Sequence, residues 1–165
     1  MSPLTRILTL ALLAVLALQA VNAQGTSDRK YLIVPASSTS PPPFPIGANY
    51  AQEPTSPVVV GGSNTGWNIK RSGGEEYLIS LEENEPRGFT QVKDNEVVVS
   101  AMPPAATWRV QKREGDTYSI EVVSNIFPTR TWTLASTVPG TKVTLEFFEI
   151  YPRPNQLWRI IPIVE

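Results

Sequence analysis

The sequence predicts an all-β protein, a β-trefoil of twelve strands in three repeats. Two observations carry this prediction. The apolar segments are short, rich in Val, Ile, Thr and aromatic residues, and separated by Pro, Gly, Asn and Asp, as in strands joined by turns. In addition, a tryptophan strand followed by a tyrosine strand recurs along the chain. Sixteen prolines and the lack of a sustained helical period argue against long helices.

The repeat is clearest in the middle of the chain. Tryptophan strands begin at Trp67 and Trp108, and each leads through a turn to a tyrosine strand, at Tyr77 and Tyr118. A third tryptophan strand at Trp158 closes the chain. Because W-x-I and Y-x-I put an aromatic and an aliphatic side chain on one strand face, these residues are expected to point into a shared core. The aromatic residues assigned to this core are Tyr31, Trp67, Tyr77, Trp108, Tyr118 and Trp158.

Each repeat reads as four strands. A single hairpin buries too little apolar surface to be stable alone, so three copies are expected to pool their inward faces. The strands are predicted at 31–34, 44–46 (weak), 57–60 and 67–71 in the first unit; at 76–81, 88–93, 96–100 and 107–112 in the second; and at 117–123, 131–136, 142–148 and 157–163 in the third.

The first residues read as a secretion signal. Arg6 precedes an apolar run over 7–20, and Val21-Asn22-Ala23 supplies small residues at the positions expected before a cleavage site. The run is too short to be a convincing membrane span. The sequence therefore predicts a signal peptide over 1–23 and a secreted, extracellular protein whose residues 24–165 form a single domain, with no membrane association after the signal is removed.

Composition excludes several functions. There is no histidine and no cysteine, so Ser-His-Asp and Cys-His catalysis and the commonest metal ligand are absent. The formal net charge of −1, without a basic patch, makes nucleic acid an unexpected partner. The sequence thus indicates a protein that binds rather than catalyses, and it predicts no enzyme activity, no cofactor and no metal site.

The chain resembles a known family over nearly all of the segment after the predicted signal. The segments WNIKRSGGEEYLISL, EVVVS, TWRVQKREGDTYSIEV, TWTL, KVTL and LWRIIPI are similar to the fungal β-trefoil serine protease inhibitors, the cospin-like family of the mycospin type. The Pro-rich stretch 35–57 departs from it, being longer and less regular. The resemblance implies an inhibitor that presents an exposed, substrate-like loop to a serine protease. A monomer is expected.

Three arginines in proline-containing connections are candidates for such a loop, because a trypsin-like specificity pocket accepts Arg or Lys. Arg87 follows Pro86, which would stiffen the backbone before it. Arg153 precedes Pro154, a residue that would obstruct cleavage after the arginine and that also argues against substrate-like docking. Arg130 stands at a strand start and is a weaker candidate. Each has a plainer interpretation, as a solvated turn residue or part of a rigid connector.

Asn49 is the fourth candidate. It lies in the connection 47–52, between two predicted strands of the first unit. The resemblance implies that loops between early strands are natural reactive sites. If Asn49 entered the specificity pocket, the target would not be a typical trypsin. The alternative is an ordinary surface loop bounded by prolines.

Two other binding functions stay open. Many β-trefoils are carbohydrate-binding lectins whose repeats carry Q-x-W, but here only Gln156 precedes a repeat tryptophan at that spacing; Thr65 and Ala106 stand at the equivalent positions. Related fungal trefoils of the clitocypin-like group inhibit cysteine proteases and favour Gly-rich loops in the first unit. Gly61-Gly62 matches that feature only faintly.

Overall fold

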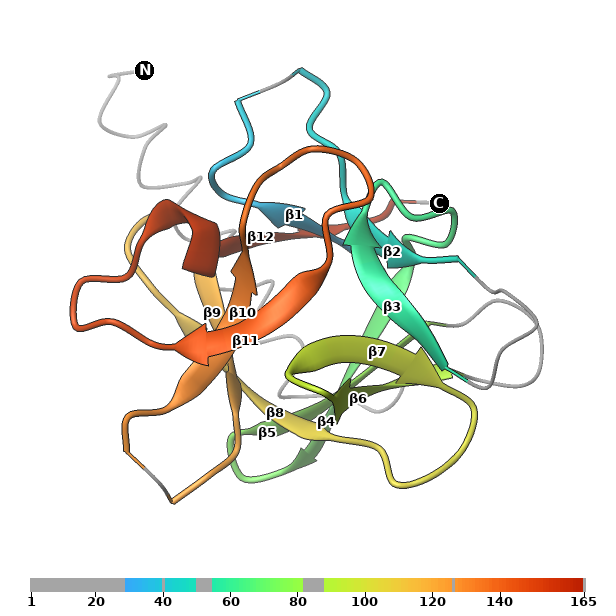
Figure 1. The fold of residues 1–165 in the computed structure, drawn as a ribbon, viewed down its shortest axis with the longest axis vertical. Coiled ribbons are helices and arrows are strands. Elements are labelled where there is room, and N and C mark those ends of the chain that lie inside the picture. The colour runs from blue at the N-terminus through green and yellow to red at the C-terminus, as the bar shows by residue number, and fades with distance from the viewer. Residues whose placement is uncertain (1–28, 40, 50–54, 82–87, 126, 165) are drawn as a thin grey trace, which may run out of the picture.

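A computed structural model describes residues 29–39, 41–49, 55–81, 88–125 and 127–164. The predicted signal peptide and Arg87 lie outside the described residues. Within them the chain forms twelve strands and one short 3-10 helix (Figure 1), so the all-β class is confirmed. The elements are β1 Lys30–Pro35, β2 Ile46–Ala48, β3 Thr55–Val60, β4 Trp67–Gly73, β5 Glu76–Leu81, β6 Gly88–Lys93, β7 Glu96–Ser100, β8 Thr107–Lys112, β9 Tyr118–Val122, β10 Arg130–Leu134, β11 Val143–Phe147, η1 Pro154–Gln156 and β12 Trp158–Pro162.

Six of these strands close a barrel. β4 pairs with β1 and β5, β8 pairs with β5 and β9, and β12 pairs with β9 and β1, all antiparallel. The ring is therefore complete, and its first and last strands are neighbours although they stand at opposite ends of the described chain (Figure 1). Full closure leaves no exposed edge in this part of the sheet.

The other six strands form three hairpins, β2–β3, β6–β7 and β10–β11. β7 pairs with β3 and with β11, and an isolated bridge joins Val59 to Lys142. The three hairpins therefore contact one another in a triangle. One hairpin per unit plus two barrel strands per unit is the β-trefoil arrangement that the repeat predicts.

The repeat tryptophans occupy equivalent places. Trp67, Trp108 and Trp158 are fully buried at or near the start of the fourth strand of their units. Each indole N–H donates to the second strand of its own unit, to the Ile46 carbonyl at 2.9 Å, the Thr90 hydroxyl at 2.7 Å and the Trp132 carbonyl at 3.2 Å, respectively. These bonds tie each hairpin to the barrel and satisfy a buried donor.

The tyrosines are the cross-strand partners of the tryptophans. Tyr118 is buried as predicted, but Tyr31 and Tyr77 are only half-buried, so the core assignment is too strong for these two. A tyrosine ring can pack while its hydroxyl stays in water. The register pairs are Tyr31 with Trp67, Tyr77 with Trp108, and Tyr118 with Trp158.

The strands of the second unit have the predicted bounds, whereas those of the first and third units differ from the prediction by one or two residues at one or both ends. Two of these differences have a visible cause. β2 runs from Ile46 to Ala48, two residues later than the predicted weak strand, and Phe44 is exposed. β12 begins at Trp158 because η1 turns the chain immediately before it. Both differences arise where the chain is held by contacts to another segment, which a strand pattern does not report.

Candidate functional site

The connection between β11 and β12, residues 148–157, is fixed at its second half. The Asn155 side-chain amide donates to the Leu134 carbonyl at 2.8 Å, and the Gln156 amide donates to the Phe147 carbonyl at 2.9 Å. Gln156 is only 2% exposed. Two amide side chains therefore hold η1 against β10 and β11.

The start of the same connection is fixed by Phe148. Its N–H donates to the Thr129 carbonyl at 2.7 Å, and the Arg113 guanidinium carbon lies 4.6 Å from its ring centroid. Arg113 is held in turn by an ion pair of 2.5 Å with the buried Glu121, whose carboxylate also accepts from the Ser119 hydroxyl. A cation over a ring is a favourable contact. Both ends of the connection are thus anchored.

Between these anchors the connection faces solvent. Ile150 is 88% exposed and Tyr151 is 87% exposed. Arg153 is exposed, forms an ion pair and hydrogen bond with Glu149, and has an extended backbone with φ −71° and ψ 152°. The hydrogen bond from Arg153 to Glu149 raises the pKa of the guanidinium, so it stays charged. An exposed aromatic and a permanent cation therefore project from a braced segment.

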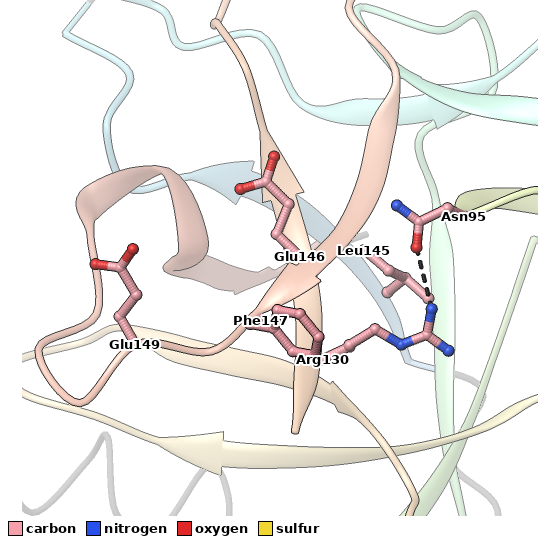
Figure 2. A pocket seen from close by; sticks show the side chains of 6 residues that line it. All are labelled: Asn95, Arg130, Leu145, Glu146, Phe147 and Glu149. Atoms are coloured by element: carbon pink, nitrogen blue, oxygen red, sulfur yellow. Dashed lines mark hydrogen bonds between the residues drawn. The ribbon is translucent and has the colours of Figure 1, made fainter. Parts of the chain in front are cut away.

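A shallow hollow of about 480 Å³ lies beside this connection (Figure 2). Arg130, the first residue of β10, forms one side of it and donates to the Asn95 side-chain oxygen at 3.1 Å. Asn95 lies in the β6–β7 turn, where Asp94 and Asn95 both have positive φ, of 50° and 65°. The lining residues are Asn95, Arg130, Leu145, Glu146, Phe147 and Glu149.

Asn49 lies in a different part of the molecule and is held in another way. Its side-chain oxygen accepts a hydrogen bond from the Ser63 N–H at 2.8 Å. Just before it, Ala48 and Asn64 exchange two backbone hydrogen bonds, of 3.1 and 3.3 Å. The start of the β2–β3 connection is therefore clamped to the β3–β4 connection.

This clamp depends on glycine. A Cβ added at Gly47 would stand 2.1 Å from the Asn64 carbonyl oxygen, and one at Gly62 would stand 2.5 Å from the Gly47 carbonyl carbon. No side chain fits at those distances, so the two backbones meet directly. Gly62 is buried for this reason, and its packing role accounts for one glycine of the Gly-rich pair noted in the sequence.

The structure brings two of the four predicted residues to one region. Arg130 lines the hollow, and Arg153 pairs with Glu149, which also lines it. Asn49 belongs to the first unit, and Arg87 lies outside the described residues. Tyr151, whose side chain is exposed, is not among the residues predicted from the sequence. The signal available was its place beside Pro152, because an aromatic in a short proline-bounded connection has little space to fold back into a core.

No three His, Cys, Asp or Glu side chains among the described residues gather closely enough to hold a metal ion. The same residues contain no helix that is both long and apolar enough to span a bilayer.

Comparison with known proteins defines the class of fold. The chain is similar to Cry35Ab1 (TM-score 0.66, 17% identity, 84% of this chain and 37% of that one). It is also similar to ThreeFoil, a designed 3-fold symmetric protein (TM-score 0.64, 16% identity, 81% and 99%). A third similar structure is the Macrolepiota procera ricin B-like lectin in complex with lactose (TM-score 0.59, 17% identity, 84% and 99%). These likenesses show the β-trefoil fold.

The chain spans just over a third of the length of Cry35Ab1. No protein-family model matches the sequence. No curated protein sequence matches it significantly either. By its fold, the chain is a β-trefoil protein.

Proposed function

We propose that this protein is a secreted, monomeric inhibitor of trypsin-like serine proteases, and that connection 148–157 is the loop it presents to the protease. The observation that carries the proposal is the combination of anchored ends with an exposed middle. Asn155 and Gln156 hold the segment through their side chains, while Tyr151 and Arg153 face solvent. A loop fixed before binding loses little entropy when it binds.

The sequence of the exposed segment suits a trypsin-like pocket. Arg153 supplies the cation that the buried carboxylate of such a pocket binds. Pro152 before it restricts the backbone, and the extended conformation of Arg153 is the one a protease cleft accepts. Its partner Glu149 lies at the surface, and an exposed ion pair of this kind is readily exchanged for a buried carboxylate.

The bond after Arg153 is poorly suited to hydrolysis. Pro154 follows it, and the Arg153 carbonyl already accepts a hydrogen bond from the Gln156 N–H at 2.9 Å. To reach an oxyanion hole, this carbonyl would have to give up that hydrogen bond. The proposal is therefore an inhibitor that fills the specificity pocket and is turned over slowly.

The proposal is tested by titrating trypsin, chymotrypsin and subtilisin with the purified protein. We expect trypsin to be inhibited at micromolar concentration or below, and Arg153→Ala to weaken that inhibition by about thirtyfold, the effect of losing a hot-spot side chain. Arg153→Lys should keep most of the inhibition because the cation remains. Arg71→Ala, at an exposed arginine of the β4–β5 hairpin, is the matched control and should change nothing.

Three results would contradict this assignment. Failure to inhibit any of the three serine proteases would remove the function. Inhibition that survives Arg153→Ala would move the reactive loop elsewhere, with Asn49, Arg130 and Arg87 as the remaining candidates. Inhibition of papain without inhibition of a serine protease would favour the clitocypin-like alternative.

The lectin alternative that rests on Q-x-W receives less support. Gln156 is the single residue that fits that motif, and its amide donates to the Phe147 carbonyl inside the protein. The side chain is buried and braces the connection, so it is unavailable to a sugar.

A further inference from the structure

We propose that the hollow beside Phe147 binds a neutral saccharide. This site is independent of the proposed inhibition, because it uses the side chains on the flank of connection 148–157 and not its exposed tip.

The walls of the hollow are fixed. Asn95 is set by the left-handed turn conformation that Asn tolerates well. Its carbonyl accepts a hydrogen bond from the Leu145 N–H at 2.9 Å, which ties the β6–β7 turn to β11. Arg130 and Phe147 stand directly opposite each other in the β10–β11 pair. The volume, about 480 Å³, is in the range of small-molecule sites.

The charges around the hollow balance. Arg130 lines the hollow with one positive charge, and Glu146 and Glu149 line it with two negative ones. Arg153, which does not line it, offsets the charge of Glu149 through their ion pair. Neither a strong anion nor a strong cation is therefore favoured by the local field. A ligand without net charge but with many hydroxyl groups meets no electrostatic penalty and finds both donors and acceptors.

The polar groups stand on either side of an exposed ring. Phe147 is 62% exposed, an unusual state for a phenylalanine in a strand. Figure 2 shows Arg130 and Asn95 on one side of this ring, joined by their hydrogen bond, and the carboxylates of Glu146 and Glu149 directed to the other side.

This arrangement matches the chemistry of a pyranose. The apolar C–H face of a sugar can lie on the ring, while its hydroxyls donate to carboxylates at one edge and accept from N–H groups at the other. A guanidinium has five N–H donors, so the bond from Arg130 to Asn95 leaves others for a ligand. A purely apolar ligand would leave these polar groups unpaired.

The test is a screen of the purified protein against an array of neutral and charged glycans, followed by titration calorimetry with the neutral sugars that bind. We expect binding to neutral sugars, weakened about tenfold or more by Phe147→Ala. Phe147→Trp should keep binding because the flat ring is retained, and Phe147→Leu should not. Phe127→Ala is the matched control, since Phe127 is an exposed phenylalanine of the same unit that does not line the hollow.

Arg130→Ala should also weaken sugar binding, and Phe147→Ala should leave protease inhibition intact while it removes sugar binding. This separates the failure of either proposal from that of the other. No array signal for neutral sugars, or sugar binding that Phe147→Ala leaves unchanged in a variant with the parent thermal midpoint, would overturn the saccharide site. Binding restricted to charged glycans would overturn it as well.

Discussion

The first and third units brace their connections by different means. In the first unit, backbone meets backbone: Gly47 lies against Asn64 and Gly62, and Ala48 exchanges hydrogen bonds with Asn64. In the third unit, side chains reach to backbone: Asn155 and Gln156 donate to strand carbonyls. Both sets of contacts fix a connection between strands, one in the first unit and the other in the third.

The difference decides which side chains remain for a partner. The clamp of the first unit includes the side chain of Asn49, whose oxygen is bonded to the Ser63 N–H. In the third unit the anchoring residues Phe148, Asn155 and Gln156 stand on both sides of the exposed ones. The side chains of Tyr151 and Arg153 are therefore left at the surface, where that of Arg153 pairs with the exposed Glu149. Rigidity alone therefore does not mark an interaction loop. The bracing must also leave side chains unused.

The largest expected effect comes from breaking the backbone clamp. Gly47→Ala places a methyl group 2.1 Å from the Asn64 carbonyl oxygen, and backbone on both sides cannot move cheaply. We expect the free energy of unfolding to fall by about 3 kcal/mol or more. Chemical denaturation of the variant and the parent measures this difference.

Gly66→Ala is the matched control for that change. Gly66 lies in the same β3–β4 connection, and the nearest atom to an added Cβ is the flexible Lys30 Cδ at 3.4 Å. Its stability should stay within about 0.5 kcal/mol of the parent. Equal losses in the two variants would show that the clamp is not specific to Gly47, and the comparison between the units would fail.

The second effect comes from the side-chain brace. Gln156→Ala removes a buried amide and leaves the Phe147 carbonyl without this donor. We expect a loss of about 2 kcal/mol in the free energy of unfolding, because the buried side chain leaves a cavity and the Phe147 carbonyl loses its donor. Trypsin inhibition should weaken as well, since the connection would no longer be fixed before binding.

Gln91→Ala serves as the control, because the Gln91 amide also donates to a backbone carbonyl, that of Met102, but at the surface. Water replaces that bond, so stability should change little. A Gln156→Ala variant that unfolds at the parent denaturant concentration would show that η1 needs no such anchor.

Most of the fold could be predicted from the sequence, for a definite reason. Trp67, Trp108 and Trp158 repeat because each must fill the same volume and bond to the same strand of its unit. A repeated environment selects a repeated residue, and a repeated residue is visible in one sequence. The half-exposure of Tyr31 and Tyr77 was not visible, since the same residue type serves at both depths.

The candidate site was less accessible to sequence reasoning. Arg130 and Arg153 were found as arginines near prolines, but the hollow that Arg130 lines depends on Asn95, which comes from another unit. Nothing local in the sequence joins Asn95 to Arg130. The bracing role of Gln156 was also hidden, because a Q-x-W match suggested a sugar contact where the structure has a buried amide.

The smallest expected effect separates the two roles open to Asn49. If its side chain serves only the clamp, Asn49→Asp should keep stability, since the bond to the Ser63 N–H uses an oxygen acceptor that a carboxylate also supplies. Asn49→Ala should lose about 0.5 kcal/mol in the free energy of unfolding, because the exposed N–H turns to water. Neither variant should alter trypsin inhibition when both are titrated beside Arg153→Ala. A loss of inhibition in Asn49→Ala without a loss of stability would place the reactive residue in the first unit, and connection 148–157 would then be a braced segment without a partner.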